Sequence, residues 1–355
     1  MGEPGEAEAQ SESQGAVART SRARRVIALT GADAFLGQNL IGLLEEDDSV
    51  ARILAIDIKS PPTAGRKTRF YKVDLTQTAV DARIAEILTT ENVDTFVHLA
   101  FLASPSHASA WAHELESVGT MHVLNACRQR AVRKFVMWSQ TLLYGASPSN
   151  PNFLAETHPL RGNTRSRFLS DKIEAESAVA RFATQMPGTV VTVLRLAPIL
   201  GPTVNNYLTR YLGRRYVPTV LGYDPLVQFV HEVDALAAFK LATVRDCPGV
   251  YNIVGDGVLP LSMAIELAGR TAIPTPGPLL RAVAGLAWAA QLAEAPPMFL
   301  QYLEWLCVAD GERAMRTLRF RPAFTSREAV IDYAGAQRLR DARLLRSTVA
   351  ADETP

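Results

Sequence analysis

The feature that most constrains the fold is an alternation of short, β-branched apolar runs with longer amphipathic stretches over the first 200 residues. The runs are Val26–Thr30, Ile53–Asp57, Phe70–Val73, Thr95–Ala100, Lys134–Ser139 and Thr189–Leu196. Strands separated by helix-length segments predict right-handed βαβ crossovers and a parallel sheet with helices on both faces. We therefore expect an α/β fold built on a doubly wound parallel sheet of the Rossmann type.

After about residue 200 the alternation gives way to a less regular stretch rich in proline, glycine and tyrosine. We expect a Rossmann domain over residues 25–200, to which 229–254 returns, and a smaller C-terminal substrate lobe over 201–340. Ligands bind such folds at the carboxyl ends of the strands, so the lobe should close over that edge. Residues 1–24 combine acids and arginines with almost no large apolar side chain, which predicts a disordered tail. Residues 341–355 are assigned to a second tail.

The charge balance and the cysteines limit the partners. With 37 basic and 36 acidic residues the net charge is +1, which gives no electrostatic footprint for nucleic acid. The cysteines are scattered, without the spacing of a disulfide framework or a zinc site, so no metal is expected and a reducing cytoplasm is favoured. They are Cys127, Cys247 and Cys307.

The stretch 279–305 is apolar enough to raise the question of whether it enters a membrane. Its almost wholly apolar part, Leu279 to Ala293, would span about 22 Å as a helix, short of the roughly 30 Å of a bilayer core. A transmembrane segment is therefore not expected, and a buried helix is the simpler interpretation. A monotopic or lipid-binding surface stays open, because the aromatic residues that follow suit an interface.

The first strand runs into a loop with the character of a phosphate-binding turn. Gly31 permits the tight turn, Gly37 permits close helix packing, and the helix that starts at this loop offers its N–H groups to a pyrophosphate. Ala34 stands where many such loops carry the middle glycine, and its methyl group would crowd the phosphates. Phe35 and Leu36 complete the expected contact.

A carboxylate stands at the position that such a loop needs for a dinucleotide. Asp57 ends the second strand 20 residues beyond Gly37, where it can accept hydrogen bonds from an adenosine ribose. An acid there repels a 2′-phosphate, so NAD is favoured over NADP. The alternative is a turn glycine with an N-capping aspartate and no cofactor.

The order of motifs over nearly the whole chain resembles the extended short-chain dehydrogenases, the NAD-dependent epimerase/dehydratase family. The matching segments are Thr30–Gly37, Asp57, Val73–Leu75, His98–Ala100, Trp138–Gly145, Arg195–Pro202, Gln228–Asp234, Gly249–Ile253 and Leu318–Pro322. The resemblance implies that Asp74 and Leu75 hold adenine, and that Leu99, Ala100 and Phe101 line the dinucleotide. It also implies a homodimer formed by the helices after the fourth and fifth strands. A strand-ending turn remains the alternative for Asp74, and His98 is expected to pack rather than to ionise.

At the catalytic site that the resemblance implies, this sequence differs from the family's motif. The family uses a tyrosine as general acid/base and a lysine four residues later, whose charge lowers the phenol pKa and whose ammonium binds the nicotinamide ribose. Here the motif aligns with Phe168 and Lys172, so only the lysine survives. A benzene ring cannot exchange a proton. Lys172 is expected to contact the ribose, with a solvated helix lysine as the alternative.

Two further positions of the family's proton relay also depart. The serine or threonine position falls on Gln140, flanked by Ser139 and Thr141, and the asparagine position falls on Glu116. Ser139 and Thr141 are candidates to orient a ligand, and Glu116 is a candidate replacement acid. The catalytic candidates are therefore Lys172, Thr141, Ser139 and Glu116.

Three functions remain open from the sequence. The first is a protein that binds NAD(H) and an unidentified small molecule without the family's turnover. The second is an active oxidoreductase, epimerase or dehydratase with a replacement acid/base, acting on a sugar nucleotide, a sterol-like or an acyl substrate. The third is an enzyme of another class that uses the cleft without a dinucleotide. Arginines that could hold a diphosphate in the second lobe are Arg210, Arg214, Arg215 and Arg281.

Overall fold

A computed structural model describes residues 24–162 and 166–352. Its centre is a sheet of seven parallel strands in the order β11-β6-β5-β4-β1-β2-β3. The strands are β1 (Arg25–Thr30), β2 (Val50–Asp57), β3 (Thr68–Lys72), β4 (Thr95–His98), β5 (Lys134–Gln140), β6 (Val190–Leu196) and β11 (Gly249–Ile253). The predicted doubly wound parallel sheet is confirmed, and β11 pairs with β6 at one edge of it.

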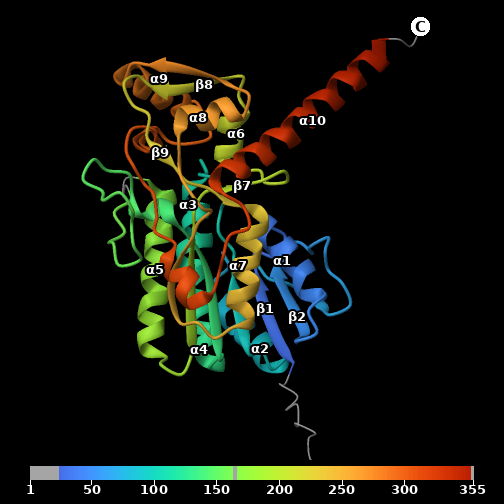
Figure 1. Ribbon diagram of the computed structural model, residues 1–355. Coiled ribbons are helices and arrows are strands. Elements are labelled where there is room, and N and C mark those ends of the chain that lie inside the picture. The colour runs from blue at the N-terminus through green and yellow to red at the C-terminus, as the bar shows by residue number, and fades with distance from the viewer. Residues whose placement is uncertain (1–23, 163–165, 353–355) are drawn as a thin grey trace, which may run out of the picture.

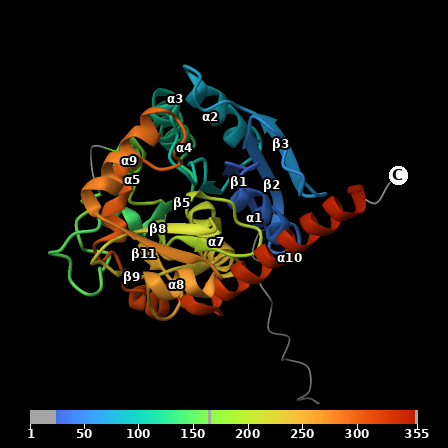
Figure 2. The same cartoon turned by 90° about the horizontal axis from the view of Figure 1, so that it is seen from above.

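Helices cover both faces of this sheet. On one face lie α2 (Val80–Thr90), α4 (Gly119–Arg130) and α5 (Arg167–Gln185), and on the other lie α1 (Phe35–Glu45) and α7 (Glu232–Val244) (Figure 2). Helix α1 shows why these segments fold as they do. Leu36, Leu40 and Leu44 recur at a spacing of four residues, so one face of the helix is buried against the sheet.

The segment before α4 has an irregular backbone that matters for the site. Helix α3 (Ser109–His113) continues into a π-helical turn, η1 (Glu114–Val118), and then directly into α4. Wider turns of this kind insert an extra residue into a helix and are frequent at functional sites. A short 3₁₀ turn, η2 (Thr141–Tyr144), follows β5.

The second lobe has a hydrophobic core of its own. Three strand pairs, β7–β10, β8–β13 and β9–β12, combine with the helices above the carboxyl ends of the sheet, as Figure 1 shows. Its elements are β7 (Ile199–Leu200), α6 (Tyr207–Gly213), β8 (Tyr216–Val220), β9 (Leu226–Val227), β10 (Val230–His231), β12 (Leu259–Pro260), α8 (Leu261–Leu267), β13 (Thr271–Thr275), α9 (Gly277–Ala289) and η3 (Pro297–Leu303).

The chain ends in a long helix. After η4 (Ala314–Leu318), helix α10 runs over Ser326–Asp352 and projects from the body (Figure 1). The segment that we assigned to a C-terminal tail from residue 341 is therefore helical as far as Asp352. The N-terminal tail expected at 1–24 lies outside the described residues except for Arg24.

Candidate functional site

The two glycines of the loop after β1 are required by close backbone contacts. Gly31 has a φ of +71°, and a Cβ there would lie 2.6 Å from the carbonyl carbon of Leu99. A Cβ on Gly37 would lie 2.0 Å from the carbonyl oxygen of Gly31. Larger residues at either position would push the loop away from the sheet, so this loop has the backbone of a phosphate cradle.

The N-terminus of α1 leaves donors available for an anion. Ala34 is the N-cap, and within the described residues no side chain caps the first turn. The first turn also contains no acidic side chain that would repel a phosphate. Unpaired N–H groups and the positive end of the helix dipole therefore face the loop, which suits a pyrophosphate.

The Asp57 carboxylate lies directly beside this loop. Its Oδ2 accepts a hydrogen bond from the Asp33 N–H at 3.0 Å, and its Oδ1 accepts one from the Ile58 N–H at 2.7 Å. Each carboxylate oxygen can accept a further hydrogen bond, and the side chain is partly exposed. These contacts hold the carboxylate where the adenosine ribose is expected.

Asp74 and Leu75 are less open to a ligand. The Asp74 Oδ1 accepts from the Thr76 N–H at 3.0 Å and the Thr76 hydroxyl at 2.8 Å, and its Oδ2 accepts from Gln77 at 3.2 Å. Leu75 is buried. The Asp74 carboxylate thus stabilises its own turn, which is the alternative that the sequence left open.

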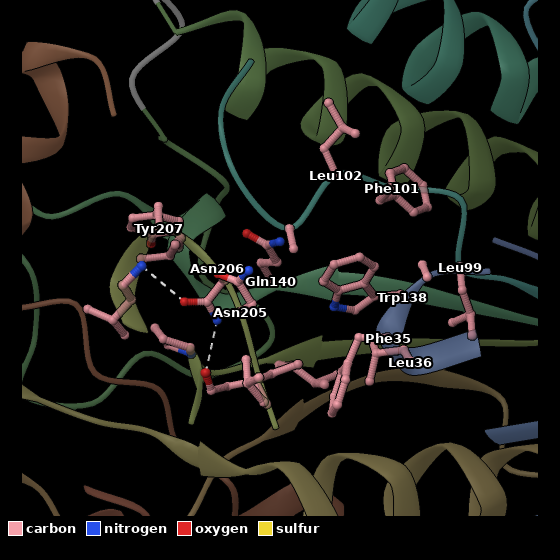
Figure 3. Close-up of a pocket in the computed structure, with 18 of the residues that line it drawn as sticks. Phe35, Leu36, Leu99, Phe101, Leu102, Trp138, Gln140, Asn205, Asn206 and Tyr207 are labelled. Atoms are coloured by element: carbon pink, nitrogen blue, oxygen red, sulfur yellow. Dashed lines mark hydrogen bonds between the residues drawn. The ribbon is translucent and has the colours of Figure 1, made fainter. Parts of the chain in front are cut away.

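A cavity of about 240 Å³ lies at the carboxyl ends of β1, β4 and β5, where the strand order changes direction. Figure 3 shows its wall, in which Ala34, Phe35, Leu36, Leu99 and Phe101 are cofactor residues that the sequence predicted. The remaining predicted cofactor residues are not part of that wall: Gly31, Gly37, Asp57, Asp74, Leu75, Ala100 and Lys172.

The cavity also brings in residues that sequence reasoning missed. The missed residues are Trp138, which points to the same side of β5 as Gln140, and Asn205, Asn206 and Tyr207, which come from the second lobe (Figure 3). The Trp138 Nε1 is buried, and no described residue accepts its hydrogen bond. The alternation of side chains along β5 was the signal for Trp138, because Gln140 had already been placed at the site.

Lys172, which we aligned with the family's lysine, is bonded to Glu116, which we aligned with its asparagine. The Lys172 Nζ lies 2.5 Å from Glu116 Oε1, and the two residues are 3% and 0% exposed. The same Glu116 oxygen accepts the Leu102 N–H at 2.6 Å, whereas Glu116 Oε2 is buried with no partner among the described residues. This burial excludes the solvated-lysine alternative. The π-helical turn η1 carries Glu116 into this contact.

Burial dominates the electrostatics of the pair. It raises the pKa of the Glu116 carboxyl, against the opposing effect of the Lys172 ammonium. It lowers the pKa of Lys172, against the opposing effect of Glu116. Each charge therefore depends on the other to remain ionised.

Three aromatic rings surround the Lys172 ammonium. Its nitrogen lies 4.4 Å from the ring centroid of Phe168, 5.2 Å from that of Phe101 and 5.9 Å from that of Trp138. Phe101 and Trp138 also line the cavity, whereas Lys172 and Glu116 do not. The faces of aromatic rings attract a cation, so the ammonium is stabilised behind the cavity wall.

Ser139 belongs to a different buried network. Its hydroxyl donates to Glu176 Oε2 at 2.5 Å, and Glu176 Oε1 accepts from Arg195 Nε at 2.9 Å. Arg195 in turn donates to the Tyr144 hydroxyl at 2.8 Å, which donates to Asn252 on β11 at 2.7 Å. This network joins β5, β6 and β11 to α5, so the Ser139 hydroxyl has a structural partner.

Thr141 and His98 complete the predicted positions. Thr141 is 2% exposed at the start of η2 and is absent from the cavity wall. His98 bridges the hydroxyls of Thr30 at 2.7 Å and Thr120 at 3.0 Å. Burial lowers the pKa of His98 to about 3, so its ring stays neutral and packs, as the sequence indicated.

One group among the described residues has the composition of a metal site. His113 Nδ1 and carboxylate oxygens of Asp171 and Glu174 lie within 4.8 Å of one another. A direct hydrogen bond of 3.0 Å joins His113 to Asp171, and this bond accounts for part of the grouping. The group lies outside the cavity wall.

The comparisons with known proteins establish the family. Residues 27–254, more than half of the chain, match the NAD dependent epimerase/dehydratase family. The chain therefore belongs to that family, as the resemblance predicted. A protein of Mycobacterium tuberculosis named "Uncharacterized protein Rv0501" is 34% identical over 317 residues, covering 87% of this chain and 83% of its own. A 3-diazoavenalumate denitrifying reductase of a Streptomyces species is 24% identical over 269 residues, covering 73% of this chain and 85% of the reductase.

Solved structures share the fold at low sequence identity. The UDP-glucose 4-epimerase of Thermotoga maritima, solved with UDP-glucose, aligns with a TM-score of 0.68 at 18% identity, covering 89% of this chain and 99% of the other. The UDP-glucose 4-epimerase of Thermus thermophilus, solved with NAD, aligns with a TM-score of 0.67 at 19% identity, covering 88% of this chain and 99% of the epimerase. The dTDP-glucose 4,6-dehydratase DesIV of Streptomyces venezuelae, solved with NAD, aligns with a TM-score of 0.69 at 17% identity, covering 89% of this chain and 98% of the dehydratase.

Among the helices that the structure describes, none has the length and apolar character needed to cross a membrane.

Proposed function

We propose that this chain binds NAD(H) at the loop between β1 and α1, together with a small-molecule ligand, and lacks the proton relay typical of its family. The observation that carries the proposal is the closed, buried pair of Lys172 with Glu116 beside Phe168. The family's lysine acts on a tyrosine and a ribose, whereas this ammonium is bonded to a carboxylate and faces a ring that has no exchangeable proton.

The residues of the loop fit the phosphates and ribose of NAD. The uncapped first turn of α1 would hold the pyrophosphate, Gly31 and Gly37 permit its approach, and Asp57 would bind the adenosine ribose. Leu99 and Phe101 would contact the nicotinamide end. Structural relatives solved with NAD support this choice of cofactor. Bound NAD would supply a hydride acceptor, and the chain's own residues would bind and orient it.

Two measurements test this proposal. Calorimetric titration should detect binding of NAD⁺ and NADH, with weaker binding of NADP⁺ because of the Asp57 carboxylate. Mixing the NAD⁺ complex with UDP-glucose should then give no NADH absorbance. No dinucleotide binding at all would refute the proposal and favour an enzyme of another class, for which the Ala34 methyl group in the loop is the supporting feature.

A repaired variant provides the matched control. Phe168→Tyr alone should be inactive, because Glu116 neutralises the Lys172 charge that would lower the pKa of a new phenol. Combining it with Gln140→Ser and Glu116→Asn restores the residue types of the family's relay. General acid/base catalysis contributes about 10²–10⁴-fold, so a gain of that order on a suitable alcohol would locate the loss in these positions.

A second candidate function rests on Glu116. Its Oε2 is buried without a partner among the described residues, and burial raises the pKa of the carboxyl. A carboxyl in this condition can serve as a replacement acid/base. A wild-type protein that turns over NAD⁺ with a substrate, and whose rate collapses in Glu116→Gln or Thr141→Val but not in Lys172→Met, would establish this function instead.

Assembly and location are part of the same proposal. A homodimer would form through the surface of α3, α4 and α5, where Trp111 and Met121 are 47% and 40% exposed. Sedimentation equilibrium should give twice the monomer mass, and Trp111→Glu with Met121→Glu should shift it to the monomer. The composition and the cysteine pattern favour the cytoplasm, so fractionation should recover the protein apart from membranes.

A further inference from the structure

A second and larger cavity, of about 520 Å³, lies within the second lobe. It is lined by residues of α6, α9, η3 and β9, and its wall is mostly aliphatic and aromatic. Its volume falls in the range of about 300–1,000 Å³ that is usual for small-molecule sites. Characteristic wall residues are Leu212, Leu280, Val283, Ala287, Phe299 and Leu300.

Three of the polar side chains in this wall, Tyr211, Tyr302 and Gln228, already have protein partners. The Tyr211 hydroxyl donates to the Pro218 carbonyl at 2.8 Å, and the Tyr302 hydroxyl donates to the Leu142 carbonyl at 2.7 Å. The Gln228 amide bonds to both the carbonyl and the N–H of Ala309. A polar ligand would lose hydrogen bonds to water without regaining them from these groups, so the wall favours an apolar ligand.

The arginines that could have held a diphosphate are mostly committed elsewhere. Arg210 Nε lies 2.5 Å from Glu294 Oε2, and Arg281 forms an ion pair with Glu304. Arg215 lies over the Tyr216 ring, with 5.4 Å from its guanidinium carbon to the ring centroid. Arg214 lines the cavity but is exposed to solvent. A nucleotide diphosphate would therefore have to compete with carboxylates for two of these four cations.

The two cavities are neighbours. Leu142, Pro198, Tyr207 and Leu208 line both of them, so a ligand can extend from the end of β5 into the second lobe. Leu279 and Val283 on α9 also line the second cavity and are 56% and 53% exposed. They give the cavity an apolar entrance.

We propose that the second cavity binds the hydrocarbon chain of an amphipathic ligand whose polar end lies in the first cavity near Gln140. This inference rests on the proposed function for the position of the polar end, while the hydrocarbon site depends only on the second lobe. It names a lipid-like ligand class in place of a nucleotide sugar. The hydrocarbon chain lies against α9, and the polar end reaches the first cavity past Tyr207 and Leu208, which line both cavities.

The test uses bromododecanol, an uncharged amphiphile whose bromine quenches tryptophan on contact. Trp305 lines the second cavity, whereas Trp111, Trp138 and Trp288 do not. Below its solubility limit in water the probe should quench the full-length protein saturably, and Trp305→Phe should remove that component. Ala287→Phe fills the cavity and should weaken probe binding by about tenfold or more, which is about 1.4 kcal/mol.

The matched control lies on the same helix. Leu286 is 74% exposed and is not part of the cavity wall, so Leu286→Phe should leave probe affinity unchanged. NAD⁺ calorimetry on each variant reports folding, and Val283→Phe replaces Ala287→Phe if the latter does not fold. Non-saturable quenching, quenching unaffected by the filling variants, or displacement of the probe by UDP-glucose would overturn the inference. Probe binding without NAD binding would refute only the proposed function. NAD binding without probe binding would refute only the hydrocarbon site.

Discussion

Lys172→Met should destabilise the protein strongly, and the loss should depend on Glu116. The substitution removes the ammonium that lies 2.5 Å from Glu116 Oε1. It leaves a carboxylate that is 0% exposed and that, among the described residues, keeps only the Leu102 N–H as a donor. Breaking a buried ion pair by removing one partner typically costs about 3–5 kcal/mol, because the remaining charge is uncompensated. We expect a loss of that size at pH 7.

The second substitution reverses much of this loss. Glu116→Gln with Lys172→Met removes both charges and retains an oxygen for the Leu102 N–H, and neutral replacements of buried pairs are often tolerated. The new amide group lacks an evident acceptor, which costs about 1–3 kcal/mol. The double variant should therefore be more stable than Lys172→Met alone, with a coupling of at least about 2 kcal/mol between the sites.

The pH dependence follows from the raised pKa of Glu116. In Lys172→Met the folded protein keeps a proton on Glu116 to higher pH than the unfolded chain, whose glutamate has a pKa of about 4.3. Between the two pKa values the folded state binds more protons, so stability falls as pH rises. The deficit should be small below about pH 4.3 and constant above the folded pKa.

Urea denaturation of the wild type, both single variants and the double variant, at several pH values, measures these quantities. The matched substitution Lys240→Met removes a lysine whose ammonium is 3.4 Å from Asp47 and whose side chain is 37% exposed, and it should cost under about 1 kcal/mol. The buried pair would be refuted if each single variant lowered the free energy of unfolding by under about 0.5 kcal/mol and the two losses simply added in the double variant. Lys172 would then be available to a ribose.

Three further outcomes are expected. Asp57→Ala should weaken NAD⁺ binding and reduce the preference over NADP⁺, measured by calorimetry; an unchanged preference would place the carboxylate away from the ribose. Ser139→Ala should cost about 1–3 kcal/mol in urea denaturation, because Glu176 loses a buried donor, while NAD⁺ affinity stays constant. The His98 ring should show no titration by NMR between pH 5 and 8, since burial lowers its pKa to about 3; a protonation step in this range, absent in His98→Gln, would contradict its buried placement.

The sequence determined the fold and the backbone of the loop after β1, because both depend on local pattern. Strand and helix alternation fixes a parallel sheet through backbone pairing and chain handedness. The spacing of Gly31, Gly37 and Asp57 predicted that the loop after β1 and the end of β2 lie together. In the structure the Asp57 carboxylate accepts a hydrogen bond from this loop. The prediction that Phe168 stands in place of the family's tyrosine also came from spacing, because Phe168 precedes Lys172 by four residues.

Only the tertiary structure decided which partners the site residues have. Glu116 and Lys172 are 56 residues apart, and their contact depends on the π-helical turn and on helix packing. Ser139 was a candidate ligand group until β6 and α5 supplied Arg195 and Glu176. A side chain's type determines whether it can donate or accept a hydrogen bond, whereas the packing of distant segments determines its partner. The second cavity also results from the packing of distant segments, so only the folded structure shows it.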